Sequence, residues 1–254
     1  MKILIITQDE PFYLFENLEY LISLLPKEVL VVGCVVNEVS PFGKKESFKD
    51  KSLKTLRIFG WKFFSYYSVK FIKRKLFQQK SVRKLLEKNN IPVIHLNENI
   101  NSENSLNLIK SYTPDLLVSI LGNQIFKERL INLAPKGCIN LHTALLPKYR
   151  GLMPTFWVLK NKEKHTGVSV FFVDKGIDSG PIIVQKKVEI KNRTLEELIK
   201  LTKQIGMESI AEAILLIRDN KVQLIPNPSE QKSYYSFPKK EDVKEFLMIG
   251  NKFF

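Results

Sequence analysis

Three polar side chains stand out within the largely apolar stretch of residues 137–180: Asn140, His142 and Asp178. Asn140 and His142 are two residues apart on a predicted strand, so both side chains point to the same face and can act as a pair. The Leu-Leu-Pro run and Gly151 that follow predict an abrupt turn, because Pro restricts the backbone and Gly permits conformations closed to other residues. We therefore expect the pair near a strand end beside a loop, where α/β sheets bind ligands.

The elements that must position these side chains follow from the apolar pattern around them. The sequence predicts a strand over 138–142, a tight loop over 145–151, a helix over about 153–161, a second buried strand over 167–173 and a turn that carries Asp174 and Asp178.

The rest of the chain alternates strands with helices. Continuous β-branched runs at 2–7 and 29–36, with a helix at 13–25 between them, predict a right-handed crossover in a parallel sheet. Further strands are predicted at 91–96, 115–121 and 181–190, the last as an edge strand, and helices at 105–111, 127–133 and from the capping box of Thr194 and Glu197 to about Asp219. The predicted fold class is α/β, a Rossmann-like and mostly parallel sheet flanked by helices, with a short C-terminal extension.

Two units are expected along the chain. Residues 1–190 form the main domain, with a basic, aromatic insertion at about 44–90, and residues 191–254 form a C-terminal helix and tail that is a candidate dimerisation region. The insertion is read in two ways. Amphipathic helices whose aromatic stripe packs on the sheet are the favoured interpretation, and a surface for a phosphorylated substrate or for anionic lipid is the alternative. Tyr234, Tyr235 and Phe237 in the tail are expected to close the core.

Composition bounds the class of protein. The 254 residues carry a formal net charge of +14, which favours an anionic partner without choosing between nucleic acid, a phosphorylated metabolite and a membrane face. The start of the chain has no signal peptide and no apolar run approaches the ~20 residues of a spanning helix, so we expect a cytoplasmic protein. Cys34 and Cys138 are expected as buried free thiols, since no zinc-ligand spacing is present.

No glycine-rich turn follows the first strand. Gln8, Asp9, Glu10 and Pro11 occupy the place of a dinucleotide or phosphate fingerprint, which argues against a nicotinamide enzyme.

Two motifs carry a resemblance to a known family. The runs NLHTALLPKYRG (140–151) and DKGIDSG (174–180) resemble the signature of the folate-dependent formyltransferases, Asn-x-His-x-Ser-Leu-Leu-Pro followed by Asp-x-Gly, with Ala144 in place of the usual Ser. The resemblance implies the formyltransferase fold and transfer of a formyl group from 10-formyltetrahydrofolate to an amine, without a metal. It also implies that Asn140 and His142 donate to the oxyanion, and that Asp178 orients His142 and accepts the amine proton.

The same resemblance implies the binding residues. The folate is expected to contact the turn after the strand at 115–121, namely Leu121, Gly122, Asn123, Gln124 and Ile125, together with Asp174 and Ile177. Candidate substrate contacts in the catalytic loop are Lys148, Tyr149 and Arg150, for which a merely solvated loop is the competing interpretation.

Family members differ in the amine that they formylate. The core resembles methionyl-tRNA formyltransferases. Because these usually continue for about another hundred residues into a barrel domain, which we do not expect here, the chain is most like the sugar N-formyltransferases. These modify nucleotide-linked dideoxy amino sugars for O-antigens of lipopolysaccharide, and they often form dimers. A nucleotide-sugar substrate and a homodimer are therefore expected, and nucleic acid is not. Methionyl-tRNA or a lipid-linked amino sugar is the alternative acceptor, and a non-enzymatic nucleic-acid or membrane binder is the competing class. The absent glycine-rich turn argues against glycinamide ribonucleotide formyltransferase.

Overall fold

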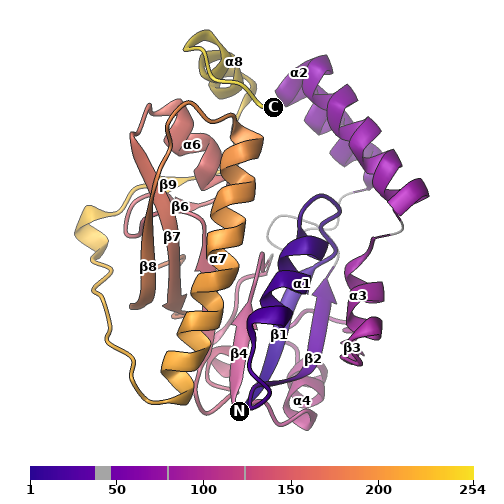
Figure 1. The fold of residues 1–254 in the computed structure, drawn as a ribbon, viewed down its shortest axis with the longest axis vertical. Helices are drawn as coiled ribbons and strands as arrows, with labels where there is room; N and C mark the ends of the chain where they lie inside the picture. Colours follow the sequence, from indigo (N-terminus) through magenta and orange to yellow (C-terminus); the bar gives the residue numbers. More distant parts are fainter. Residues whose placement is uncertain (38–46, 79, 123) are drawn as a thin grey trace.

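The computed structural model describes residues 1–37, 47–78, 80–122 and 124–254 (Figure 1). Asn123 and parts of the predicted insertion, residues 44–46 and 79, therefore lie outside the described residues. The elements are β1 (Lys2–Gln8), α1 (Leu14–Leu24), β2 (Leu30–Asn37), α2 (Phe48–Lys73), the π-helical turn η2 (Arg74–Gln78), α3 (Val82–Lys88), β3 (Val93–Ile94), α4 (Glu103–Ser111), β4 (Leu116–Ser119), α5 (Glu128–Ile131), β5 (Cys138–His142), β6 (Arg150–Gly151), α6 (Pro154–Lys160), β7 (His165–Phe172), β8 (Ile182–Glu189), α7 (Leu195–Arg218), the 3-10 turn η3 (Ser229–Gln231), β9 (Tyr234–Tyr235) and α8 (Lys240–Met248).

One seven-stranded sheet, in the order β3-β2-β1-β4-β5-β7-β8, organises the chain. The five strands from β3 to β5 pair in parallel, whereas β7 and β8 run antiparallel. The predicted α/β class and mostly parallel sheet are confirmed, and β8 is the edge strand that its alternating pattern predicted. The predicted capping box at the start of α7 is also present, since Thr194 and Glu197 cap each other's backbone.

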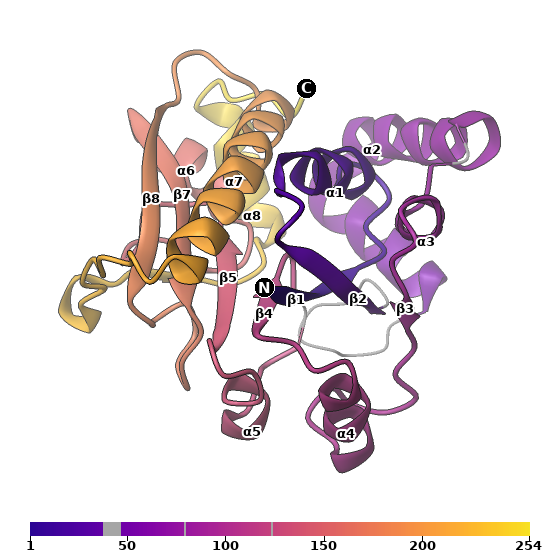
Figure 2. The ribbon, with the colours of Figure 1, turned by 60° about the horizontal axis from the view of Figure 1, so that its bottom comes forward.

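Helices cover both faces of the sheet, as Figure 2 shows for α1 and α7 on one side and α4 and α5 on the other. Alternate residues of β1 enter different cores: Ile5 packs with side chains from α1, α3 and α7, and Leu4 packs with side chains from α4 and α5. Cys34 and Cys138 are buried free thiols in β2 and β5, as predicted, and burial raises the pKa of both. The sheet therefore sits between two apolar layers, with its strand ends left for a site.

The helix α2 corrects the favoured interpretation of the basic, aromatic insertion. It is kinked at Gly60, whose φ of +81° few other residues adopt, and Phe59 is the only buried residue of the helix. Phe59 and Phe63 pack on Phe237 and Phe253 of the C-terminal segment, not on the sheet. Figure 1 shows α2 standing beside α8, apart from the sheet. The prediction that the aromatic stripe packs on the sheet was wrong, because the C-terminal segment, which is distant in sequence, supplies the side chains on which it packs.

The prediction that the aromatic residues of the tail close the core is confirmed for two of the three residues. Tyr235 and Phe237 pack against the cluster built by α6, α8 and the start of α7, and β9 pairs with β6. Tyr234 is 49% exposed and does not help to close the core, because neighbouring residues of a strand point to opposite sides. In the described part of the chain, every helix is too short or too polar to cross a bilayer.

A buried carboxylate ties α2 to α7. Glu196, at the start of α7, accepts hydrogen bonds from Lys70 (2.7 Å) and Tyr66 (2.8 Å) of α2 and is 2.8 Å from the ammonium of Lys200. Burial alone would raise the pKa of Glu196, but the hydrogen bonds from Lys200, Lys70 and Tyr66 outweigh it and hold that pKa at about 2.

A pH-dependent contribution to stability follows from this lowered pKa. A carboxylate with a depressed folded-state pKa stabilises the protein above its ordinary pKa and loses that contribution as pH falls through the folded value. The Glu196→Gln variant should therefore be less stable than the parent protein at pH 7, by up to about 3 kcal/mol, and the difference should shrink between about pH 4.5 and about pH 2. Urea unfolding of both proteins across this range measures it. Glu230→Gln, an exposed control, should show no such trend, and a constant difference for Glu196→Gln would contradict the argument.

Candidate active site

Asn140, His142 and Asp178 line one cavity of about 330 Å³ at the end of β5. The other residues that line this cavity are Gln8, Leu14, Asn17, Ile120, Leu121, Gly122, Leu141, Thr143, Gly151, Leu152, Met153, Pro154, Lys203, Met207 and Phe237. The structure thus brings together the three residues that the sequence singled out. The carboxyl end of β5 lies beside that of its parallel neighbour β4, the kind of place where α/β sheets bind ligands.

The imidazole of His142 is held between a backbone carbonyl and a carboxylate. Its Nε2 lies 2.7 Å from the carbonyl oxygen of Tyr149, and because that oxygen can only accept, Nε2 carries a hydrogen and donates. Its Nδ1 lies 3.6 Å from Oδ2 of Asp178. The side chain of His142 is only 7% exposed. The ring nitrogen left for chemistry is therefore Nδ1, on the side of the carboxylate.

Asp178 is oriented by the loop that follows β5. Its Oδ2 accepts a hydrogen bond from the backbone N–H of Gly151 at 2.8 Å. Its own φ is +49°, in the left-handed region where, apart from Gly, residues such as Asn and Asp are enriched. A turn held in that region aims the carboxylate back at His142 instead of into solvent.

A residue that the sequence did not single out holds the Asp178 turn in place. The amide of Asn227 donates to the backbone carbonyls of Asp178 (3.0 Å) and Gly180 (2.9 Å). Arg150 donates in turn to the side-chain oxygen of Asn227 at 2.9 Å and to its carbonyl at 3.1 Å. Asn227 is far from the motif along the chain and sits in a Pro-flanked turn, so no local pattern marked it.

The three candidate substrate contacts of the loop lie in different surroundings. Tyr149 is buried, stacks on Tyr235 with ring centroids 5.2 Å apart and donates its hydroxyl to Glu163 at 2.8 Å. Arg150 is also buried and donates a hydrogen bond to the side chain of Asn227, whereas Lys148 is exposed. None of the three lines the cavity of His142.

Gly151 is required by the close approach of the tail. Its φ is +98°, and a Cβ there would overlap the carbonyl oxygen of Tyr235. The short β6–β9 pairing, in which Gly151 faces Tyr235, is thus what presents the Gly151 N–H to Asp178.

A second cavity, of about 140 Å³, adjoins the first. Predicted folate contacts line it: Gly122, Gln124, Ile125, Asp174 and Ile177. Leu121 lines the first cavity instead, and Asn123 lies outside the described residues. Asn140 and Asp178 line both cavities, so two ligands placed in them would meet at these side chains.

Lys203 of α7 is a further side chain of the first cavity that the sequence reading missed. Its ammonium lies 3.8 Å from Oε2 of Glu10, and burial lowers its pKa although the charge of Glu10 opposes the shift. The sequence did contain a signal for Lys203: it lies three and four residues before Gly206 and Met207, which are buried, and so on the inward face of the helix. Across the described residues, no group of three or more His, Cys, Asp or Glu side chains is arranged to hold a metal ion.

The fold and the site define a class: a mostly parallel α/β sheet with an Asn–His–Asp set at the end of β5, where two cavities share lining residues. The Formyl transferase family model matches residues 68–214, more than half of the chain. This chain belongs to the formyl transferase family.

Comparisons with individual proteins place the chain among several kinds of relative. Methionyl-tRNA formyltransferase of Acetivibrio thermocellus is 34% identical over 154 residues, which are 60% of this chain and 49% of that protein. This chain spans about half the length of the curated relatives it matches.

Two solved structures share the fold at low identity. An N-formyltransferase from Helicobacter canadensis, in complex with folinic acid and dTDP-3-aminofucose, aligns with a TM-score of 0.57 and 21% identity over 93% of this chain and 71% of its own. Phosphoribosylglycinamide formyltransferase from Anaplasma phagocytophilum aligns with a TM-score of 0.64 and 17% identity, over 94% of this chain and 99% of its own.

Proposed function

We propose that this protein is an N-formyltransferase that moves a formyl group from 10-formyltetrahydrofolate to the amine of a nucleotide-linked amino sugar. The observation that carries the proposal is the junction of the two cavities at Asn140 and Asp178, with His142 beside it. The smaller cavity, lined by the predicted folate contacts, takes the donor, and the larger one takes the acceptor.

The folate donor, when bound, supplies an activated formyl carbon. Attack of the neutral amine on that carbon forms an N–C bond and puts negative charge on the formyl oxygen and positive charge on the amine nitrogen. Asn140 donates its amide hydrogen to the oxygen, and a donor of this kind contributes roughly 10²–10³ in rate. His142 adds a second donor through Nδ1, which is charged when the ring is an imidazolium.

Asp178 is the proton acceptor of the proposed reaction. Its carboxylate lies 3.6 Å from Nδ1 of His142 and lines the acceptor cavity, so it accepts the proton that the attacking amine loses. When the carbon–nitrogen bond to the donor breaks, the departing folate nitrogen takes up a proton, and the acceptor leaves as a formamide.

The acceptor is the finer part of the proposal. The Helicobacter canadensis neighbour is described in complex with a dTDP-linked amino sugar, which supports an acceptor of that kind, destined for O-antigen or a similar glycan. The curated relatives favour methionyl-tRNA as the second candidate. We also propose that the enzyme works in the cytoplasm as a homodimer whose contact involves residues 191–254.

Mass spectrometry tests both acceptors in one experiment. The purified protein is incubated with 10-formyltetrahydrofolate and, in separate reactions, with amino sugars linked to dTDP, UDP or GDP and with charged methionyl-tRNA. A gain of one formyl group on one nucleotide sugar, absent without the donor, is the expected result. If only the tRNA is formylated, methionyl-tRNA is the acceptor and the nucleotide sugar is not. If none of the acceptors is formylated, the proposal is contradicted.

Removal of the amide that holds the Asp178 turn should slow this reaction without unfolding the protein. Asn227→Ala deletes the two hydrogen bonds to the carbonyls of Asp178 and Gly180, and a misplacement of about 1 Å at a reacting group costs up to roughly 10² in rate. We expect kcat to fall by about 10- to 100-fold. Asn251→Ala removes a comparable bond, to the carbonyl of Leu159, away from the cavity, and should leave kcat unchanged. Equal effects of the two variants would show that Asn227 acts only on stability.

A further inference from the structure

A strongly basic groove lies between α2 and α7. It has a volume of about 730 Å³, and five of its lining side chains are basic: Lys62, Lys70, Lys73, Arg74 and Lys200. The carboxylate among its lining residues is Glu196. An excess of this size concentrates positive potential in a concave surface, where it attracts anions more strongly than scattered surface lysines do.

Some cations of the groove are paired with no carboxylate in the described part of the chain. Glu196 pairs with Lys70 and Lys200, and Arg74 pairs with Glu16 at 2.7 Å. Within residues 1–37, 47–78, 80–122 and 124–254, Lys62 and Lys73 lie within 4.0 Å of no carboxylate, and both are exposed. Two ammonium groups therefore remain available to a ligand at the mouth of the groove.

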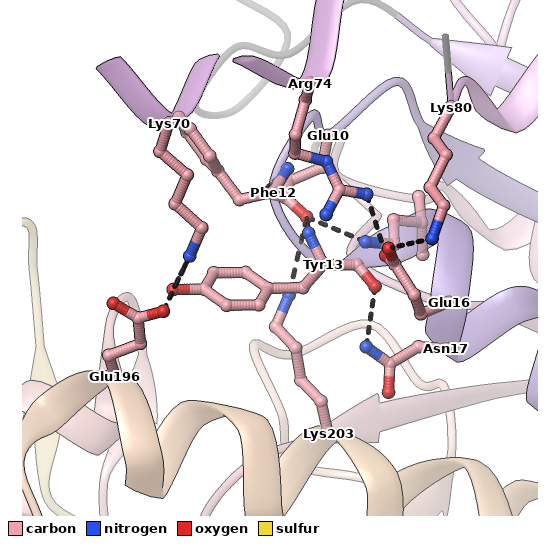
Figure 3. Close-up of polar contacts among 11 residues, drawn as sticks. Glu10, Phe12, Tyr13, Glu16, Asn17, Lys70, Arg74, Lys80, Glu196 and Lys203 are labelled. Carbon is pink, nitrogen blue, oxygen red and sulfur yellow. Dashed lines mark hydrogen bonds and ion pairs between the residues drawn. The ribbon is translucent and has the colours of Figure 1, made fainter. Parts of the chain in front are cut away.

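A third cavity lies along the path from the groove to the active site and shares lining residues with both. An intervening cavity of about 480 Å³ shares Lys70, Arg74 and Lys200 with the groove, and Asn17 with the cavity of His142. At the centre of this path the ring of Tyr13 lies between two cations: the ammonium of Lys70 is 4.5 Å from its centroid and that of Lys203 is 5.1 Å (Figure 3). Basic side chains therefore line each of the three cavities.

The place where α/β folds often hold a phosphate is already taken. Helix N-termini bind anions through free backbone N–H groups. At the start of α1, Glu10 fills that position: its carboxylate accepts from the N–H groups of Phe12 (2.8 Å), Tyr13 (2.9 Å) and Leu14 (3.1 Å). Figure 3 shows Glu10 beside Tyr13 and Lys203. Phosphates on the acceptor then need another group of cations, and the groove supplies one.

Part of one wall of the groove lies outside the region that the family model matches. The first part of α2, with Lys62 and Tyr66, precedes the residues 68–214 that match the family model. Tyr66 also stacks on Phe254, with ring centroids 4.0 Å apart and planes at 11°, which gives the groove an aromatic edge beside its lysines. A basic groove with an aromatic edge suits a ligand that has both phosphates and a flat base.

We propose that the groove between α2 and α7 binds the nucleoside diphosphate part of the acceptor, while the amino sugar extends past Asn17 to Asn140 and Asp178. This inference deepens the proposed function and rests on it for the identity of the acceptor. The binding site itself is testable without catalysis.

Binding of dTDP and of inorganic pyrophosphate, measured by calorimetry, tests the site. The double variant Lys62→Ala, Lys73→Ala leaves the Glu196 and Glu16 pairs intact and should weaken both ligands about 10-fold or more, since each lost charge contact is worth a several-fold change in affinity. The matched double variant Lys221→Ala, Lys232→Ala removes two exposed charges elsewhere and should bind as the parent does. Equal weakening by both double variants, or no binding to the parent protein, would overturn the proposal.

Kinetics and RNA binding separate this proposal from the proposed function. With an active acceptor, the groove variant should raise KM about 10-fold with kcat unchanged, because the groove lies outside the reacting centre. If dTDP binds and the groove variant weakens it but no nucleotide sugar is formylated, the site stands and the choice of acceptor fails. If instead the groove variant weakens the binding of tRNA, and dTDP does not compete with the tRNA, the groove binds RNA and the proposal is overturned.

Discussion

Asp178→Asn is expected to lower kcat for formyl transfer by about 10²–10⁴-fold, the range typical of a lost proton acceptor. Asn keeps the shape of the side chain and an oxygen that can accept from the N–H of Gly151. Asn also adopts the φ of +49° of this position readily, so the turn should keep its conformation. What is lost is the negative charge beside Nδ1 of His142 and the capacity to take a proton.

Single-turnover measurements with the formyl donor in excess give this loss directly. Donor binding, measured by calorimetry, should change little, and circular dichroism should match that of the parent protein. A variant that keeps more than about a tenth of the parent rate would remove Asp178 from the proton transfer and leave it a structural role.

Phe246→Ala is expected to lower the free energy of unfolding by about 3–5 kcal/mol. Phe246 of α8 is fully buried, with its ring stacked on Phe156 of α6 at 4.8 Å and on Phe253 at 5.1 Å between centroids. Truncation leaves a cavity in the cluster that also receives Phe59 of α2. The C-terminal segment and α2 should therefore loosen together.

Urea unfolding, followed by circular dichroism, measures this change. Met248→Ala is the control on the same helix, because its side chain is 75% exposed and should change stability by less than about 0.5 kcal/mol. Equal and small effects of the two substitutions would mean that α8 contributes little to the folded state. A large loss that leaves the dTDP affinity of the groove unchanged would mean that α2 is held by its ion pairs with α7 alone.

The groove and the active site depend on different kinds of contact. The active site is built on the end of β5, whose backbone is paired on both sides by β4 and β7. The groove depends on α2, which is joined to α7 chiefly through Glu196 and to the tail through Phe59. Acidic pH should therefore weaken the groove wall before it disturbs the sheet, because the Glu196 contacts are lost as its carboxylate is protonated.

The sequence alone determined the sheet and the position of Asn140 and His142. Apolar β-branched runs predict buried strands, and a spacing of two puts both polar side chains on one face, because these features depend on residues that are neighbours along the chain. The motif at 174–180 likewise placed Asp178 in a turn after a strand, and the edge strand β8 followed from its alternating pattern.

Only the tertiary structure decided which distant side chains complete the site. Asn227 reaches the Asp178 turn because the chain returns from α7 along the sheet edge, where Ile225 pairs with Ile182. Lys203 enters the cavity through the rotation of α7 about its axis, and α2 leaves the sheet because Phe59 finds its partners in the C-terminal segment. Contacts of this kind depend on how whole elements pack across many residues of chain, and local periodicity carries no information about that packing.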